Sequence, residues 1–123
     1  MTRSILLLNP PSLPATIANR EGSAGMGVLG DTANPFVYPP HLLATAGAAL
    51  RAAHWRVAAL DAVALGLDAG AALARMPASD VVVLPVSYGT QAADRAFLHR
   101  LRERKPLARV LAIGPALTYA QVD

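Results

Sequence analysis

The chain of 123 residues contains no cysteine. Without thiols it has no disulfide framework, no thiolate metal site and no iron–sulfur cluster of its own. No apolar run approaches the roughly 20 residues that span a bilayer. The start of the chain holds only the apolar run 5–8, which is too short for a secretory signal. These absences favour a cytoplasmic protein with no membrane partner.

Charged residues are also scarce, at 15% of the chain, and the formal net charge is only +3. The one dense basic cluster, RLRERK at 100–105, falls at the end of a predicted helix. Cations there complement the negative end of the helix dipole. Because no aromatic residues are interleaved with these cations, as a nucleic-acid groove would require, we expect no nucleic-acid partner.

Four short apolar runs have the pattern of strands buried in a parallel sheet. These runs are residues 5–8, 57–60, 81–86 and 110–113. Helical patterns over 41–53, 67–76 and 90–105 lie between the later runs. Pro40 suits the first turn of one helix, and Thr90 suits the N-cap of another. This alternation predicts parallel strands joined by right-handed crossovers.

The predicted fold is therefore an α/β domain with a flavodoxin-like (Rossmann-like) open parallel sheet in the strand order 2-1-3-4. A complete fold of this type has a fifth strand and a final helix, which the sequence through residue 123 does not supply. Either the sheet is complete with four strands, or residues 1–123 are the N-terminal part of a larger enzyme. An open sheet edge would allow a homodimer.

The segment GSAGMGVLGD at 22–31 has the spacing Gly25-x-Gly27-x-x-Gly30 of a dinucleotide fingerprint. Such a fingerprint must directly follow a strand and directly open a helix. Here the preceding strand ends at Leu8, and the prolines of DTANPFVYPP prevent a helix afterwards. The segment is therefore expected to be a pliable backbone over the carboxyl edge of the sheet, or else a mobile loop with no ligand role.

In open α/β sheets, ligands bind at the carboxyl ends of the strands, where the strand order reverses. The predicted order places that point between the first and third strands. The residues expected there are Asn9, Pro10, Pro11, Ser12, Ser87, Tyr88, Gly89 and Thr90, with Asp61, Gly114 and Pro115 from the neighbouring strands. Two of them have an alternative role that involves no ligand. Ser87 would also suit an ordinary turn, and Asp61 would also cap the turn that follows it.

Five segments together resemble the N-terminal cobalamin-binding domain of B12-dependent radical SAM enzymes. They are ILLLNPPS, NREGSAGMG, YPPHLLATAGAALRAAHWRVAALDA, DVVVLPVS and VLAIGP. The resemblance covers essentially the whole chain. It implies a flavodoxin-like domain that binds cobalamin over the carboxyl edge of the sheet, with the nucleotide tail running into the sheet. The expected binding residues are then the rim residues above together with Gly25, Gly27 and His41.

The sequence departs from the pattern of classical cobalamin domains in several places. Their DxHxxG motif is absent, since Asp31 is followed by Ala33 where the motif needs histidine. The resemblance therefore implies cobalamin without a protein histidine on cobalt. Ser87 to Gly89 stand where classical domains have SxL, and Gly114 with Pro115 stand where they have GG. The usual AGH at the end of the first helix reads AHW at 53–55, so its glycine is lost.

The radical SAM motif CxxxCxxC is not in this chain. The resemblance therefore implies that the iron–sulfur cluster and S-adenosylmethionine belong to a partner domain, in the same or another chain. No complete catalytic site is expected here, and the histidines show no metal-site spacing. His41 is placed either to contact the corrin or to be solvated.

Two other function classes stay open. One is a non-enzymatic α/β interaction domain that has kept the scaffold and lost the ligand. The other is a flavin- or nucleotide-binding relative of flavodoxin, although the loop after the first strand is long and rich in proline for a phosphate cradle.

Overall fold

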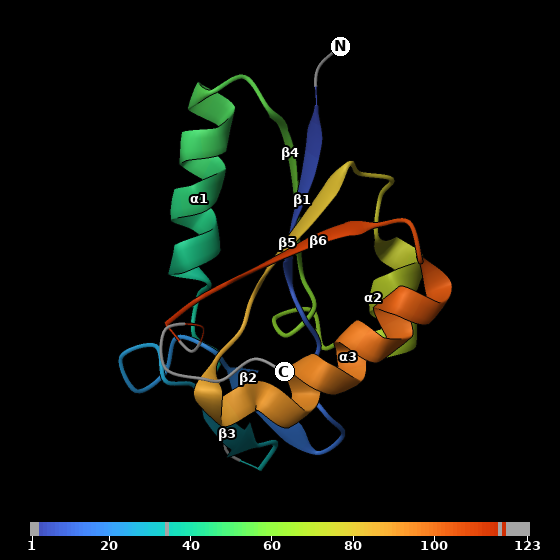
Figure 1. The fold of residues 1–123 in the computed structure, drawn as a ribbon. Helices are drawn as coiled ribbons and strands as arrows, with labels where there is room; N and C mark the ends of the chain where they lie inside the picture. Colours follow the sequence, from blue (N-terminus) through green and yellow to red (C-terminus); the bar gives the residue numbers. More distant parts are fainter. Residues whose placement is uncertain (1–2, 34, 116, 118–123) are drawn as a thin grey trace.

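The computed structural model describes residues 3–33, 35–115 and 117 and shows a mixed α/β domain (Figure 1). A four-stranded parallel sheet runs through its centre, and a two-stranded sheet lies beyond one end. In chain order the elements are β1 (Ser4–Asn9), β2 (Thr16–Asn19), β3 (Val28–Asp31), α1 (His41–Ala52), β4 (Arg56–Asp61), α2 (Ala69–Arg75), β5 (Val81–Pro85), the 3-10 turn η1 (Tyr88–Thr90), α3 (Gln91–Arg104) and β6 (Arg109–Ile113). No helix among the described residues is long and apolar enough to cross a membrane.

The main sheet has the order β4-β1-β5-β6, and each neighbouring pair is parallel. Numbered along the chain, this is 4-1-5-6 and not the predicted 2-1-3-4. The numbering differs because the connection after β1 contains two strands, β2 and β3, where an irregular loop was predicted. The parallel sheet with helices on both faces is consistent with the Rossmann-like class.

The two additional strands form an antiparallel hairpin in which β2 pairs with β3. Gly25 and Gly27 lie in the turn between these strands with φ of +89° and +85°, in the left-handed region that glycine adopts readily. Strand β3 follows directly, and α1 begins only at His41. The glycine run is therefore not the strand-to-helix turn of a dinucleotide fingerprint, in agreement with the analysis of its flanks.

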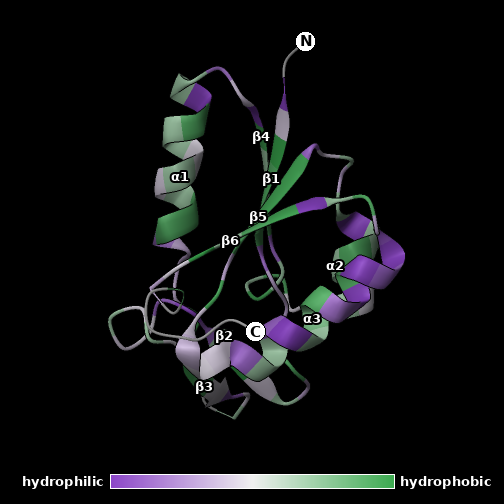
Figure 2. Cartoon of the chain, viewed as in Figure 1, coloured by the Kyte–Doolittle hydropathy of each residue, from purple (hydrophilic) through white to green (hydrophobic). Residues whose placement is uncertain are grey.

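One face of the sheet is covered by α2 and α3. Leu6 and Leu8 of β1 and Leu84 of β5 are fully buried there, against a helix layer that includes Phe97 and Leu101 of α3. Figure 2 shows hydrophobic colour along the strands and hydrophilic colour on the outward side of α3. This face holds the larger apolar core, whose burial is the main stabilising term in folding.

The opposite face is covered by α1. A smaller cluster joins Ile5, Leu7 and Val83 of the sheet to Leu43 of the helix. The helix comes close because Gly47 has no side chain: a Cβ there would lie 2.9 Å from Leu7 Cδ1. Leu111 on β6 pairs with Val83 and so belongs to the same face, yet it is 54% exposed.

Helix α1 ends in a left-handed turn although the sequence has His54 where glycine is usual. His54 takes the left-handed conformation with φ of +65°. The N–H of Trp55 donates to the carbonyl of Leu50 at 3.0 Å, and the N–H of His54 donates to the carbonyl of Arg51 at 3.0 Å. These bonds satisfy the last carbonyls of the helix as a Schellman-type ending does. Histidine therefore fills a position that normally favours glycine.

Candidate functional site

The carboxyl edge of the sheet brings the sequence-predicted residues together, but it packs many of them against one another. Asn9, Pro10 and Pro11 are buried where β1 ends. Ser87 and Thr90, after β5, are 1% and 0% exposed. Ser12 is half-buried, and its hydroxyl accepts a hydrogen bond from the N–H of Ala18 at 2.8 Å. In the exposed or half-buried part of the edge lie Tyr88, Gly89, Gly114 and Pro115.

The hairpin turn lies against the segments that follow β5 and β6 at the carboxyl edge. The N–H of Gly89 donates to the carbonyl of Met26 at 2.7 Å. At Gly27 a side chain would collide with Ser87, so only glycine allows the turn to sit this low. Gly25 lies against Pro115, with 3.0 Å between the position of a Cβ and the proline Cγ. Gly25 and Gly27 thus allow close contact between the hairpin turn and the edge of the main sheet.

Beneath the hairpin turn lies a buried arginine that the sequence analysis did not single out. Arg20, at the end of β2, is 5% exposed. Its Nε and Nη2 lie 2.8 Å and 2.7 Å from Oδ1 of Asp94 on α3. Its Nη1 donates to Asn9 Oδ1 at 3.1 Å and to the Pro10 carbonyl at 2.7 Å. The guanidinium therefore ties the hairpin to both β1 and α3.

Burial lowers the pKa of the Arg20 guanidinium, while the nearby carboxylates of Asp94 and Asp61 act in the opposite direction. A buried charge of this kind is tolerated only with a close partner and further hydrogen bonds. Arg20 has both. The one signal in the sequence was Asp94, a carboxylate at a position where the apolar stripe of α3 predicts burial.

Asp94 also organises the turn after β5. Its Oδ2 accepts from Thr90 Oγ1 at 2.8 Å and from the N–H of Ser87 at 3.3 Å. The hydroxyls of Ser87 and Thr90 are hydrogen-bonded to each other. Thr90 was predicted to cap α3, but it makes no side-chain cap bond because its hydroxyl is directed to Asp94. Both hydroxyls therefore support the edge from inside.

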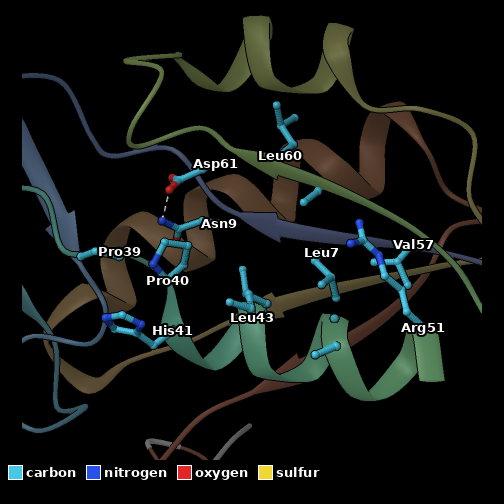
Figure 3. Close-up of a pocket in the computed structure, with 14 residues that line it drawn as sticks. Leu7, Asn9, Pro39, Pro40, His41, Leu43, Arg51, Val57, Leu60 and Asp61 are labelled. Carbon is cyan, nitrogen blue, oxygen red and sulfur yellow. Dashed lines mark hydrogen bonds between the residues drawn. The ribbon is translucent and has the colours of Figure 1, made fainter. Parts of the chain in front are cut away.

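On the α1 face, a groove of about 360 Å³ runs between α1 and the strands β1 and β4 (Figure 3). Its walls are mainly apolar, with Leu7, Leu43 and Val57 among the lining side chains. Its volume lies in the range of small-molecule sites. We call this feature the α1 groove.

The mouth of the α1 groove lies at the carboxyl edge and is polar. It is formed by Asn9, Asp61 and His41, with Pro39 and Pro40 beside them (Figure 3). The Nδ2 of Asn9 donates to Asp61 Oδ1 at 2.9 Å. The same carboxylate oxygen accepts the N–H of Ala64 at 3.1 Å, so Asp61 caps the turn after β4 and lines the groove as well. His41, the first residue of α1, is exposed.

The N-terminus of α1 is already matched to an anion of the protein itself. Oε1 of Glu21 accepts the N–H of Leu42 at 3.0 Å. A carboxylate at this position interacts favourably with the positive end of the helix dipole. It takes the place at which a phosphate would otherwise bind to the helix.

A second groove, of about 590 Å³, lies on the other face, between the hairpin and helices α2 and α3. Its floor includes buried apolar side chains such as Ile17 and Phe97, and its rim includes Arg100 and Asp68. Pro11 and Ser12 line this second groove, so the NPPS turn divides its residues between the two grooves.

Searches of protein-family models, of curated proteins and of solved structures find no match for this chain. Within the described residues, no group of three or more histidine, aspartate or glutamate side chains could hold a metal ion. The chemistry of the site must therefore be argued from its own residues.

Proposed function

We propose that this chain is a cobalamin-binding module of flavodoxin-like fold, which works with the cluster-bearing domain of a B12-dependent radical SAM enzyme. The α1 groove is the observation that carries the proposal. It opens at the carboxyl edge next to the point where the strand order reverses, which is where open α/β sheets bind ligands. An apolar interior with a few polar groups at its mouth suits a planar nucleotide base attached to a polar ring system.

The residues of the edge fit such a ligand in two parts. Leu7, Leu43 and Val57 would hold the tail of the cofactor inside the α1 groove. The corrin ring would rest over the edge, above the hairpin turn and the exposed Tyr88. Ser87 and Thr90 would then support this surface from beneath, because their hydroxyls are hydrogen-bonded to each other and Asp94 accepts from the Ser87 N–H and the Thr90 hydroxyl.

When bound, cobalamin supplies a carrier for a methyl group or a redox centre, and the protein supplies position and exclusion of water. Pro39 and Pro40 narrow the groove mouth without adding hydrogen-bond donors. The ion pair of Arg20 and Asp94 keeps the hairpin against the sheet, so that the surface above the edge has one defined shape.

The alternative of a flavin or nucleotide ligand is less well supported. Such ligands carry phosphate, and the carboxylate of Glu21 stands at the N-terminus of α1 where a phosphate would bind. Asp61 adds a second carboxylate at the groove mouth. The terminal phosphate monoester of flavin mononucleotide carries close to two negative charges, so both groups would repel it more strongly than the singly charged phosphodiester in the tail of cobalamin.

An interaction module is the second candidate, and the uncovered part of the α1 face favours it. Leu111 is 54% exposed, and β6 is an edge strand of the four-stranded sheet. An edge strand presents unpaired backbone groups to a partner strand. Light scattering on the cobalamin-free chain separates the two candidates, because a stable dimer without ligand would favour the interaction module.

The direct test is a titration of the purified chain with hydroxocobalamin, followed by gel filtration and by the visible spectrum. We expect co-elution of the cofactor and a changed spectrum, whereas flavin mononucleotide in a parallel run should not be retained. Absence of cobalamin retention at a concentration of tens of micromolar, on the order of a weak specific site, would contradict the proposal.

A further inference from the structure

We infer that Asn9 and Asp61 form a recognition pair for a primary carboxamide at the mouth of the α1 groove, and that Arg20 is the residue that positions this pair. The inference rests on the proposed function, since the corrin ring of cobalamin carries primary carboxamides around its rim. It adds the class of ligand group that these two residues select.

The two neighbours of Asn9 fix the orientation of its side-chain amide. Arg20 Nη1 lies 3.1 Å from Asn9 Oδ1, and a guanidinium can only donate hydrogen bonds. On the other side, Asp61 Oδ1 lies 2.9 Å from Asn9 Nδ2, and a carboxylate can only accept. Both neighbours therefore require the same orientation of the amide, which an isolated asparagine would leave open.

Asn9 and Asp61 each retain hydrogen-bonding capacity that the described residues do not use. The amide group of Asn9 has two N–H bonds, and within the described residues it donates only to Asp61. Asp61 Oδ1 accepts from Asn9 and Ala64, whereas Oδ2 accepts no hydrogen bond from the described residues. Since both residues line the groove, its mouth offers a donor and an acceptor side by side (Figure 3).

A donor beside an acceptor matches the hydrogen-bonding groups of a primary carboxamide. A primary carboxamide has a carbonyl that accepts from Asn9 and an N–H that donates to Asp61. A carboxylate of the same shape can only accept, and it would meet the negative charge of Asp61. The charge of Arg20 does not offset this repulsion at the mouth, because Asp94 already pairs with it. Of the other groove residues, Arg51 lies at the far end, away from Asp61, and His41 lies at the mouth with the ring of Pro40 between it and Asp61 (Figure 3).

The experiment compares cyanocobalamin with its three separated monocarboxylates, in each of which one propionamide of the ring is hydrolysed to an acid. For the unmodified chain, we expect at least one monocarboxylate to bind about tenfold more weakly than cyanocobalamin. Asp61→Asn keeps the shape of the mouth and removes its charge, so this ratio should fall to roughly threefold or less. Asp68→Asn is the matched control: Asp68 also accepts a backbone N–H, from Ala71, but it lines the other groove, and the wild-type ratio should persist.

Arg20→Lys tests the positioning role. Lysine retains a charge for Asp94, but it lacks the rigid fork that spans Asp94, Asn9 and the Pro10 carbonyl together. We expect the ratio between the amide and acid ligands to shrink, because the Asn9 amide is no longer held in one orientation. A purely structural role would weaken both ligands equally and leave the ratio unchanged. Should this variant fail to fold, the Asp61→Asn result decides the inference.

The outcomes separate the two proposals. If cyanocobalamin and all three monocarboxylates bind the unmodified chain equally well, the recognition pair is wrong and the proposed function stands. If none of them binds, the proposed function fails and the recognition pair fails with it. If Asp68→Asn lowers the ratio as much as Asp61→Asn, the effect comes from overall charge and the recognition pair is again wrong.

Discussion

The two faces of the central sheet differ in how completely they are covered. Two helices, α2 and α3, cover one face and bury Leu6, Leu8, Leu84 and Phe97 almost completely. The other face is packed by α1 over a smaller cluster, with Leu111 left 54% exposed and the α1 groove beside the helix. The strands thus carry a larger buried cluster on one side and line the α1 groove on the other, whereas the second groove lies between the hairpin and helices α2 and α3 and is not lined by strands of the main sheet.

This difference has a local cause in the residues of α1. The helix presents Gly47, Ala44 and Ala48 toward the groove. Because the side chains of alanine and glycine are small, the helix can lie close to the sheet while the space beside it stays unfilled. Facing the other side, α3 contributes Phe97 and Leu101, which fill their layer. Small residues on one helix and large ones on the other separate a site from a core.

The largest expected effect comes from truncation of the covered face. Phe97→Ala removes a ring that is 2% exposed and should lower the free energy of unfolding by about 4 kcal/mol. Leu43→Ala on the α1 face should cost about 2 kcal/mol, because leucine is the smaller side chain and Leu43 belongs to the smaller buried cluster. Urea denaturation of both variants checks the comparison, and equal losses would show that the two faces are equally well packed.

The next effect concerns the ion pair that joins the two sides of the edge. Arg20→Met leaves the carboxylate of Asp94 buried without its partner and should lower the free energy of unfolding by about 3 kcal/mol. The double variant Arg20→Met/Asp94→Asn should recover part of this loss, because no buried charge then remains unpaired and the amide oxygen can still accept the hydrogen bonds of Thr90 and Ser87. Thermal unfolding measures both. A double variant that is no more stable than Arg20→Met would contradict this account of the pair.

The four strands of the main sheet and the three helices on its two faces are the part of the fold that the sequence predicts best. Its apolar runs, and prolines such as Pro40 and Pro106, give the strands and helices to within a few residues. The hairpin was missed because β2 and β3 have only four residues each, with sequences TIAN and VLGD that lack a clear strand pattern. A loop that was expected to be irregular therefore contains two strands, which changes the numbering of the sheet.

The sequence predicted which residues lie at the carboxyl edge, but not the contacts that they make with one another. The carboxyl-edge residues lie together because parallel strands end at one edge, which sequence order is enough to suggest. The position of Asp94 on the apolar stripe of α3 indicates its burial, but its partner Arg20 lies 74 positions away and no local pattern identifies it. Its consequence, the burial of Ser87 and Thr90 under the hairpin, could not be predicted for the same reason. Of the expected binding residues, the α1 groove collects Asn9, His41 and Asp61.

A smaller effect is expected at the end of α1. His54 holds φ of +65°, a conformation that is strained for any residue with a side chain. His54→Gly should relieve this strain and raise the free energy of unfolding by roughly 0.5 to 1 kcal/mol. His99→Gly, within α3, is the control and should destabilise by about 1 kcal/mol. Denaturant midpoints of the two variants should therefore move in opposite directions.

The smallest effect lies at the amino edge, opposite the site. Hydrogen bonds from the N–H and hydroxyl of Ser4, at 2.7 Å and 2.9 Å, lower the pKa of Asp80. The stability they give is present above the unfolded pKa of about 3.9 and is lost as the pH falls through the lower folded pKa. Asp80→Asn should flatten the dependence of unfolding on pH in this acid range. An unchanged dependence would show that Asp80 contributes nothing there.

The most direct test of the account fills the α1 groove and measures cobalamin binding. Ala48 and Ala49 are neighbouring exposed residues of the same helix, but only Ala48 lines the groove. Ala48→Phe should weaken hydroxocobalamin binding by about tenfold or more, and Ala49→Phe should change it by less than about twofold. If Ala48→Phe folds as the unmodified chain does and binds hydroxocobalamin with the same affinity, the groove is not where the cofactor sits.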